Sequence, residues 1–226
     1  MGNNIRLITY SRSFLIGDMY DYTDENTYSF EFGKSYALIG DFGKGGNSIS
    51  GLLTNKYKIM NESIEINNAK DNLYPQKAGW CIGQSSFSKI TGHEISLNRL
   101  LKESENSPLF SELVDFFRIN PREMPHYISE MAHEKWRVSI AIGLLKNKKV
   151  FGFSFMNSRF LYDVLYSSGN ALSIKKITEY GGIVIIPTND KELITPIVDN
   201  VITLNNSRFE SLFSYVKDQM ERMDIK

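Results

Sequence analysis

Residues 36–48 read Tyr36-Ala37-Leu38-Ile39-Gly40-Asp41-Phe42-Gly43-Lys44-Gly45-Gly46-Asn47-Ser48. A short apolar run enters a glycine-rich turn, and an amphipathic segment with Ile49, Leu52 and Leu53 follows it. Glycines placed in this way let backbone N–H groups converge on a phosphate at the start of a helix. The stretch therefore predicts a strand, a phosphate-binding loop and a helix, in that order.

The spacing of this loop follows the pattern G-x-x-x-x-G-K-[ST], in which the Lys reaches the phosphates and the hydroxyl holds Mg²⁺. Gly40 and Gly45 have the required separation, but Gly46 and Asn47 stand where the Lys and the Ser or Thr belong. Ser48 offers a hydroxyl one position later, and Lys44 lies two residues too early. Two interpretations stay open: weak phosphate binding through backbone N–H groups and Lys44, or a glycine turn without a ligand.

The composition narrows the class of protein. The length of 226 residues suits one domain with a substantial core. Lys plus Arg and Asp plus Glu balance at 26 each, so the net charge gives no support to nucleic-acid binding. A single cysteine, Cys81, excludes an internal disulfide framework and suits a reducing cytoplasm. No apolar run reaches the roughly 18 residues of a membrane span, and the N-terminus does not read as a secretory signal.

Hydrophobic periodicity predicts an α/β fold. We expect strands at 5–10, 28–32, 35–39, 64–66, 78–83, 150–155, 183–186 and 201–204, with a further edge strand at 59–60. Helical spacing appears at 48–53, through the block 94–145, before Gly181-Gly182, and in the tail from Arg208. Short, fully apolar strands that alternate with helices predict a parallel sheet covered by helices, with the helical block inserted between two halves.

In this order, the elements resemble the ATP-binding subunit, or nucleotide-binding domain, of ABC transporters over nearly the whole chain. Five stretches carry the resemblance: the loop region 34–48, Trp80-Cys81-Ile82-Gly83-Gln84, the signature-like segment 127–145, the strand approach 146–151, and 182–190. The resemblance implies a P-loop NTPase-like ABC ATPase domain over 1–226. Residues 1–93 and about 146–226 would form a mostly parallel core with an antiparallel part, and about 94–145 a helical sub-domain.

The resemblance also assigns candidate ligand-binding residues. The phosphate loop would contribute Gly40, Gly43, Lys44, Gly45, Gly46, Asn47 and Ser48. Gln84 stands at the Q-loop position, next to the segment 85–92 where a membrane partner would dock. Phe14 is similar to the aromatic residue that stacks on adenine, with an ordinary core or surface aromatic as the alternative.

The catalytic positions of the family hold unsuitable residues. The Walker B strand should end in Asp for the metal and Glu for the attacking water, but Ser154 and Phe155 stand there. Asn189 replaces the switch histidine, and we favour a helix cap for Thr188-Asn189-Asp190. Ala132 and His133 replace the signature Ser-Gly-Gly, and no metal-ligand spacing links the histidines.

These substitutions indicate a catalytically degenerate subunit. We expect weak ATP binding at most, poorly held Mg²⁺, and little or no hydrolysis by this chain alone. Its partners would be integral membrane subunits and a second ATP-binding subunit, in a homo- or heterodimer, at the cytoplasmic face of the cell membrane. A slow ATPase with substitute residues, and a free-standing interaction module on the same fold, stay open as alternatives.

Overall fold

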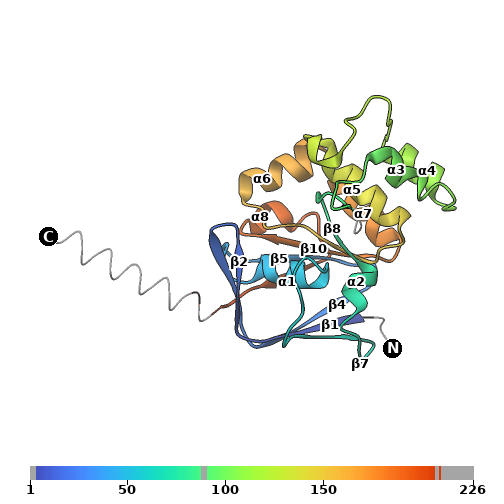
Figure 1. The fold of residues 1–226 in the computed structure, drawn as a ribbon. Coiled ribbons are helices and arrows are strands. Elements are labelled where there is room, and N and C mark those ends of the chain that lie inside the picture. Colours follow the sequence, from blue (N-terminus) through green and yellow to red (C-terminus); the bar gives the residue numbers. More distant parts are fainter. Residues whose placement is uncertain (1–3, 88–90, 207–208, 210–226) are drawn as a thin grey trace.

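A computed structural model describes residues 4–87, 91–206 and 209. Figure 1 shows a layered arrangement, with a central sheet, helices over one face, and a second, antiparallel sheet beyond the other face. The helix α1 (Gly46–Leu53) lies between the two sheets. The predicted α/β class, with a parallel core and an antiparallel part, is confirmed.

The central sheet is parallel throughout. Its strands lie in the order β11-β5-β10-β9-β8, and they are β5 (Ser35–Ile39), β8 (Gly79–Cys81), β9 (Val150–Gly152), β10 (Ile183–Thr188) and β11 (Asn200–Thr203). Because both faces are covered, β9 and β10 are fully buried and read as continuous apolar runs. Their carboxyl ends share one edge of the sheet.

Alternating side chains of this sheet enter two separate hydrophobic cores. Tyr36 and Leu38 of β5 pack with α1 and the antiparallel sheet, whereas Ala37 packs on the opposite face with the helices. The same alternation places Ile183 and Ile185 on one side of β10 and Val184 and Ile186 on the other. The central sheet therefore separates a helical layer from a β layer.

The helical layer shares its core with the sheet. It contains α3 (Leu97–Lys102), α4 (Phe110–Phe116), α5 (Glu134–Leu145), α6 (Ser158–Tyr162), α7 (Ala171–Glu179) and α8 (Lys191–Ile194), with the short turns η1 (Ile128–Glu130) and η2 (Asp163–Ser167). Leu113 of α4 and Ile140 of α5 belong to the same buried cluster as Phe151 of the sheet. Within residues 94–145, α3, α4, η1 and α5 are separated by turns and irregular segments.

The β layer consists of a sheet and a separate hairpin. The sheet has the order β4-β1-β6-β7, formed by β1 (Asn4–Thr9), β4 (Asn26–Glu31), β6 (Ser63–Ile66) and β7 (Ala69–Lys70). The hairpin pairs β2 (Arg12–Ile16) with β3 (Met19–Thr23). Figure 1 shows this hairpin extending past α1, beside the loop that follows β5.

Several predicted bounds need correction. Residues 59–60 form no strand, because the backbone there bonds to side chains: Met60 N–H donates to Glu62 over 2.8 Å. The predicted strand 150–155 ends at Gly152, and the predicted strand 78–83 is only β8, preceded by the short helix α2 (Tyr74–Ala78). The predicted helix stop is confirmed at Gly181, where φ is +69°. The tail from Arg208 lies outside the described residues, apart from Phe209.

Candidate functional site

The candidate site lies at the carboxyl edge of the central sheet, the usual place for ligands in open α/β folds. The loop 40–45 follows β5, Ser154 and Phe155 follow β9, and Asn189 follows β10. Because β10 lies between β5 and β9, the sheet order brings these three segments together.

The loop after β5 has the backbone conformation that its glycines permit. Gly43 and Gly45 have φ values of +103° and +95°, in the region that side chains rarely adopt. A Cβ atom at Gly45 would lie 2.5 Å from the carbonyl oxygen of Tyr22, so this position also needs glycine for space. Helix α1 begins directly after Gly45, and the loop N–H groups converge at its amino end.

A buried carboxylate, that of Asp21 on β3, occupies this convergence point. Its Oδ1 accepts hydrogen bonds from the N–H groups of Gly43 at 3.1 Å and Gly45 at 2.8 Å. Its Oδ2 accepts from both the N–H and the hydroxyl of Ser48, each at 2.7 Å. Asp21 is only 1% exposed. The backbone donors that we expected to serve a phosphate are bonded to a residue of the chain itself.

The remaining loop side chains make internal contacts as well. Lys44, which we expected near a phosphate, has its ammonium nitrogen 5.7 Å from the centroid of the Phe209 ring. Asn47 is buried, and its Oδ1 accepts from the N–H of Phe155 at 3.2 Å. At Gly46 a Cβ atom would lie 3.1 Å from Cβ of Pro187 and 3.3 Å from Cδ1 of Leu204. A lysine at that position would therefore require neighbouring side chains to move.

The segment after β9 is held by apolar and backbone contacts. The ring of Phe155 packs edge-to-face on Phe42 of the loop, with 5.5 Å between centroids. Ser154 accepts a hydrogen bond from the ammonium of Lys56 over 3.3 Å. Neither side chain can bind a divalent cation as a carboxylate does, and a phenyl ring cannot accept a proton. Within residues 4–87, 91–206 and 209, no cluster of three or more His, Cys, Asp or Glu could hold a metal ion.

The segment after β10 is a helix cap, which confirms the favoured interpretation of Thr188-Asn189-Asp190. Asp190 accepts a hydrogen bond from the N–H of Leu193 at 2.9 Å and begins α8. This N–H and the Ser158 hydroxyl lower the pKa of Asp190 below its ordinary value. Thr188 is buried and accepts from the N–H of Asp190, whereas Asn189 is exposed.

Phe14 lies in the core, the alternative that was left open for it. It is 5% exposed, and its ring centroid lies 5.4 Å from that of Tyr57. The guanidinium of Arg12 covers the ring at 4.2 Å from its centroid. In this position the ring has almost no exposed face on which an adenine could stack.

Gln84 and the two residues directly before the signature-like helix are exposed. Gln84 is exposed, directly after Gly83, whose N–H donates to the Ser139 hydroxyl of α5 at 2.9 Å. Ala132 and His133 are also exposed and precede α5, which has no side-chain cap at His133. Residues 88–90 of the expected docking segment 85–92 lie outside the described residues.

Asp21, which accepts from the loop N–H groups, was not among the site residues predicted from the sequence. One signal was available: aspartate is depleted in strands, and this one sits between Tyr20 and Tyr22 in an alternating stretch. Its partner, however, is set by the contact between β3 and α1, which lie far apart in the printed sequence.

Comparison with solved structures identifies the fold. The chain aligns with the dimeric structure of MJ0796, a bacterial ABC transporter cassette, at a TM-score of 0.62 and 15% identity, over 89% of this chain and 94% of that one. It aligns with the ADP conformation of MJ1267, an ATP-binding cassette of an ABC transporter, at a TM-score of 0.61 and 16% identity, over 91% and 88%.

This chain has the fold of an ABC transporter ATP-binding cassette. CbiO1 from Clostridium perfringens, part of the ABC transporter complex CbiONQ, matches at a TM-score of 0.61 and 15% identity, over 99% of this chain and 96% of that one. No family model and no curated protein sequence matches the chain. In these alignments the shared fold extends over almost the whole length of both aligned chains.

The nucleotide that this fold implies does not fit the residues at the site. In the cassette fold the loop after β5 would receive phosphate, but the Asp21 carboxylate already accepts from its N–H groups. A second negative charge beside that carboxylate would be repelled in a buried site. The end of β9 offers no carboxylate for Mg²⁺ or for a water. We therefore derive no hydrolytic step at this site.

Proposed function

We propose that this chain is a catalytically degenerate ATP-binding-type subunit of an ABC transporter. It would serve as a structural or regulatory partner of integral membrane subunits, with a second cassette subunit in the same assembly. The proposal rests on the cassette fold together with one observation: Phe155 packs on Phe42 at the strand end where this fold places its catalytic carboxylate.

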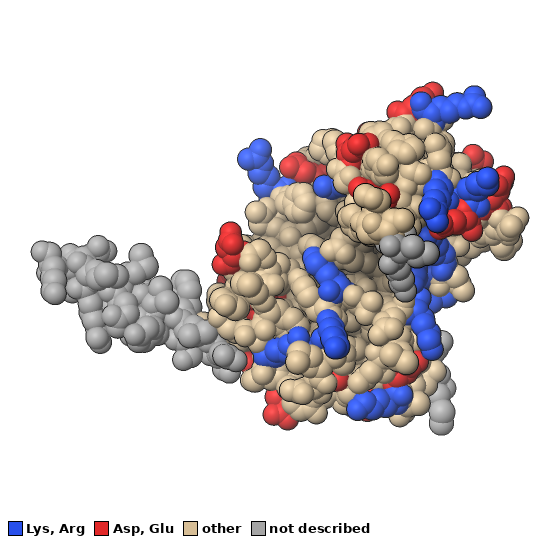
Figure 2. Space-filling model, viewed as in Figure 1, with Lys and Arg blue, Asp and Glu red and all other residues tan. Residues whose placement is uncertain are grey.

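The structural matches support an assembled subunit. The fold matches a cassette described as part of a transporter complex and another described as dimeric. None of the described helices is both long and apolar enough to cross a membrane. Figure 2 shows charges of both signs spread over the face in view, which is consistent with the balanced composition. We propose that the chain lies at the cytoplasmic face of a membrane, held there by its partners.

The expected docking segment carries an exposed apolar residue. Phe87 is 61% exposed and pairs through an isolated antiparallel bridge with Glu94. Exposed aromatic side chains of this kind are common anchors at protein interfaces. Gln84, three residues earlier, is exposed on the same segment. We propose that this segment contacts the membrane subunit.

Co-purification from detergent-solubilised membranes tests the proposal. The unmodified chain should retain a polytopic membrane protein, and Phe87→Asp should lose it. Met60→Asp is the matched control, because Met60 is 68% exposed but lies in the β layer. Retention of no membrane protein by the unmodified chain would contradict the proposal. So would ATP turnover by the complex that survives removal of the catalytic glutamate from the second cassette subunit.

A further inference from the structure

The most unusual feature of the molecule is the buried Asp21 carboxylate, which lies among the backbone N–H groups at the amino end of α1. Backbone N–H groups at a helix amino end, in a glycine loop, attract negative charge through their aligned dipoles. Here the charge is supplied by the Asp21 carboxylate, and both of its oxygens accept from loop donors. The contacts resemble those expected for a bound phosphate, but the anion is covalently part of the chain.

The strand that carries Asp21 is fixed to the loop by its backbone. The N–H of Tyr22 donates to the carbonyl of Gly43 at 3.0 Å, directly beside the carboxylate contacts. The carbonyl of Tyr22 accepts from the side-chain amide of Asn206 at 2.6 Å. Thr23, two residues after Asp21, is buried as well. The position of Asp21 is therefore set by the backbone contacts of the next residue, Tyr22.

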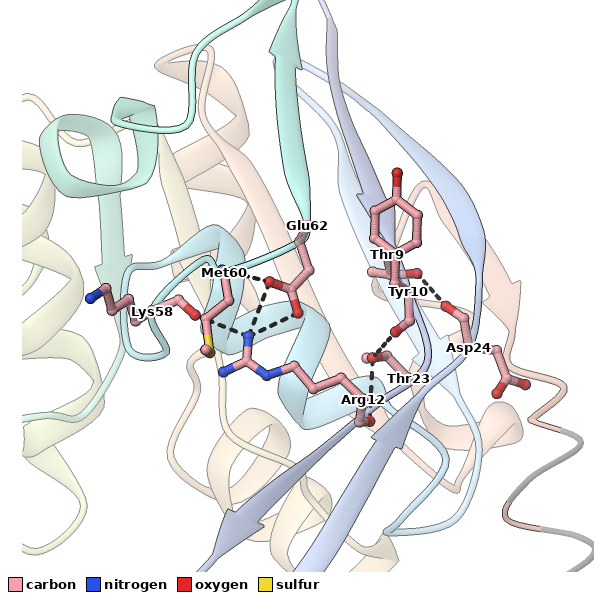
Figure 3. A network of polar contacts seen from close by, with 8 residues as sticks. All are labelled: Thr9, Tyr10, Arg12, Thr23, Asp24, Lys58, Met60 and Glu62. Atoms are coloured by element: carbon pink, nitrogen blue, oxygen red, sulfur yellow. Dashed lines mark hydrogen bonds and ion pairs between the residues drawn. The ribbon is translucent and has the colours of Figure 1, made fainter.

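A polar network fixes the open end of the same hairpin. Figure 3 shows Arg12 of β2 reaching Glu62, with its Nη1 2.8 Å and 3.0 Å from the two carboxylate oxygens and 3.1 Å from the carbonyl of Lys58. The Thr23 hydroxyl donates to the carbonyl of Tyr10 at 2.8 Å, and the Thr9 hydroxyl donates to that of Asp24 at 2.7 Å. These contacts connect the hairpin to the antiparallel sheet.

We propose that Asp21 is a built-in anion that takes the place of the nucleotide phosphate in this cassette fold. The loop then needs no ligand to satisfy its N–H groups, and the fold is complete without nucleotide. A phosphate could enter only by displacing Asp21 and leaving a buried carboxylate without its donors. That displacement lowers the affinity of the loop for phosphate by about a hundredfold or more.

The proposal predicts a latent phosphate site that appears when the carboxylate is removed. Asp21→Ala leaves the N–H groups of Gly43, Gly45 and Ser48 unpaired and opens space beside them. Inorganic phosphate should then bind and restore the lost contacts. Asp18→Ala is the matched control, because Asp18 is exposed and lies at the turn of the same hairpin.

The experiment is thermal unfolding of the three proteins in inorganic phosphate and in sodium chloride of equal ionic strength. Phosphate should raise the melting temperature of Asp21→Ala by about 5 °C or more at saturation, relative to chloride. The unmodified protein and Asp18→Ala should show no such difference. If Asp21→Ala does not fold in chloride, recovery of its circular dichroism spectrum in phosphate is the readout.

Three results would overturn the proposal. One is a folded Asp21→Ala protein that is indifferent to phosphate, and another is an unfolded one that phosphate does not recover. The third is an equal phosphate effect on the unmodified protein, which would mean that the loop is already open. None of these bears on the membrane partner, because the co-purification experiment is made with Asp21 in place.

Discussion

Two segments at the edge of the central sheet differ in what occupies the positions where our proposal places phosphoryl-transfer groups. The loop after β5 keeps the glycine backbone of a phosphate site, and its N–H groups bond to the Asp21 carboxylate. The segment after β9 carries Ser154 and Phe155, and the Phe155 ring packs on Phe42. The first segment holds a carboxylate, whereas the second is packed through aromatic rings.

The difference follows from what each segment must satisfy. Backbone N–H groups cannot be removed by substitution, so a loop that loses its ligand still needs an acceptor for its buried donors. A catalytic carboxylate is only a side chain, and a substitution can remove it without leaving an orphaned donor. Under our proposal, the loop therefore requires a built-in acceptor, whereas the strand end requires only a residue that packs.

Asp21→Ala tests the loop half of this comparison and should have the largest effect on stability. The substitution leaves several buried donors unpaired, and we expect the free energy of unfolding to fall by about 4 kcal/mol in phosphate-free buffer. Urea denaturation measures it, with Asp18→Ala expected within about 0.5 kcal/mol of the unmodified protein. An Asp21→Ala protein as stable as the unmodified one would show that the contacts are incidental.

Arg12→Met tests whether the ion pair at the open end of the β2–β3 hairpin helps to hold Asp21 in position. Glu62 is 1% exposed, and Arg12 is its cation, so the variant should lose about 2–3 kcal/mol at neutral pH. Burial alone would raise the pKa of Glu62, but the Met60 N–H and Arg12 outweigh it and hold that pKa below its ordinary value.

The sign of the pH effect follows from that lowered pKa. The stabilisation from Glu62 is present above the unfolded value of about 4.3 and is lost as the pH falls through the lower folded pKa. Urea denaturation between neutral and acid pH should show this loss in the unmodified protein. In Arg12→Met the loss should shrink or reverse, and an unchanged pH profile would contradict the role given to the ion pair.

Phe155→Ala tests the packing half of the comparison. Phe155 is half-buried, and loss of its edge-to-face contact with Phe42 should lower the free energy of unfolding by about 1–2 kcal/mol. The effect should be smaller than that of Asp21→Ala, because no charged hydrogen bond is broken. A larger effect would mean that the segment after β9, rather than the loop, is the critical contact.

Tyr57→Phe provides the opposite case, a buried polar group without a partner. Among the described residues, the Tyr57 hydroxyl is buried with no hydrogen-bond partner, and burial raises its pKa to about 12. Removal of the hydroxyl should leave stability unchanged or raise it by up to about 1 kcal/mol. The unmodified protein should lose stability as the pH rises from about 10 toward 12, and the variant should lose less over the same range.

The sequence predicted the framework of the site but not its occupant. Residues 35–39, the glycine turn and the following helix were expected, because apolar runs and glycine spacing are local signals. The resemblance assigned Ser154, Phe155 and Asn189 to the ends of two strands, and the sheet order makes those strands neighbours. Asp21 was missed because its partners lie more than 20 residues away and are set by how β3 packs against α1.

Two features of the β layer were also not predicted correctly from the sequence. Residues 59–60 look like a strand, but the Met60 N–H and the Lys58 carbonyl bond to the side chains of Glu62 and Arg12. The pairing of β2 with β3 was also not predicted, although its turn at Gly17 has a φ of +61°. The first case depends on Arg12, which lies on a distant strand, whereas β2 and β3 form a local hairpin.

Titration of the unmodified protein with MgATP tests the central claim most directly. The readout is the amide chemical shifts of Gly43, Gly45 and Ser48, whose N–H groups bond to Asp21. We predict that these shifts stay constant up to millimolar MgATP, because their acceptor is already in place. Saturable shifts at all three amides, with a dissociation constant in the micromolar range, would show that nucleotide displaces Asp21 and would contradict the account.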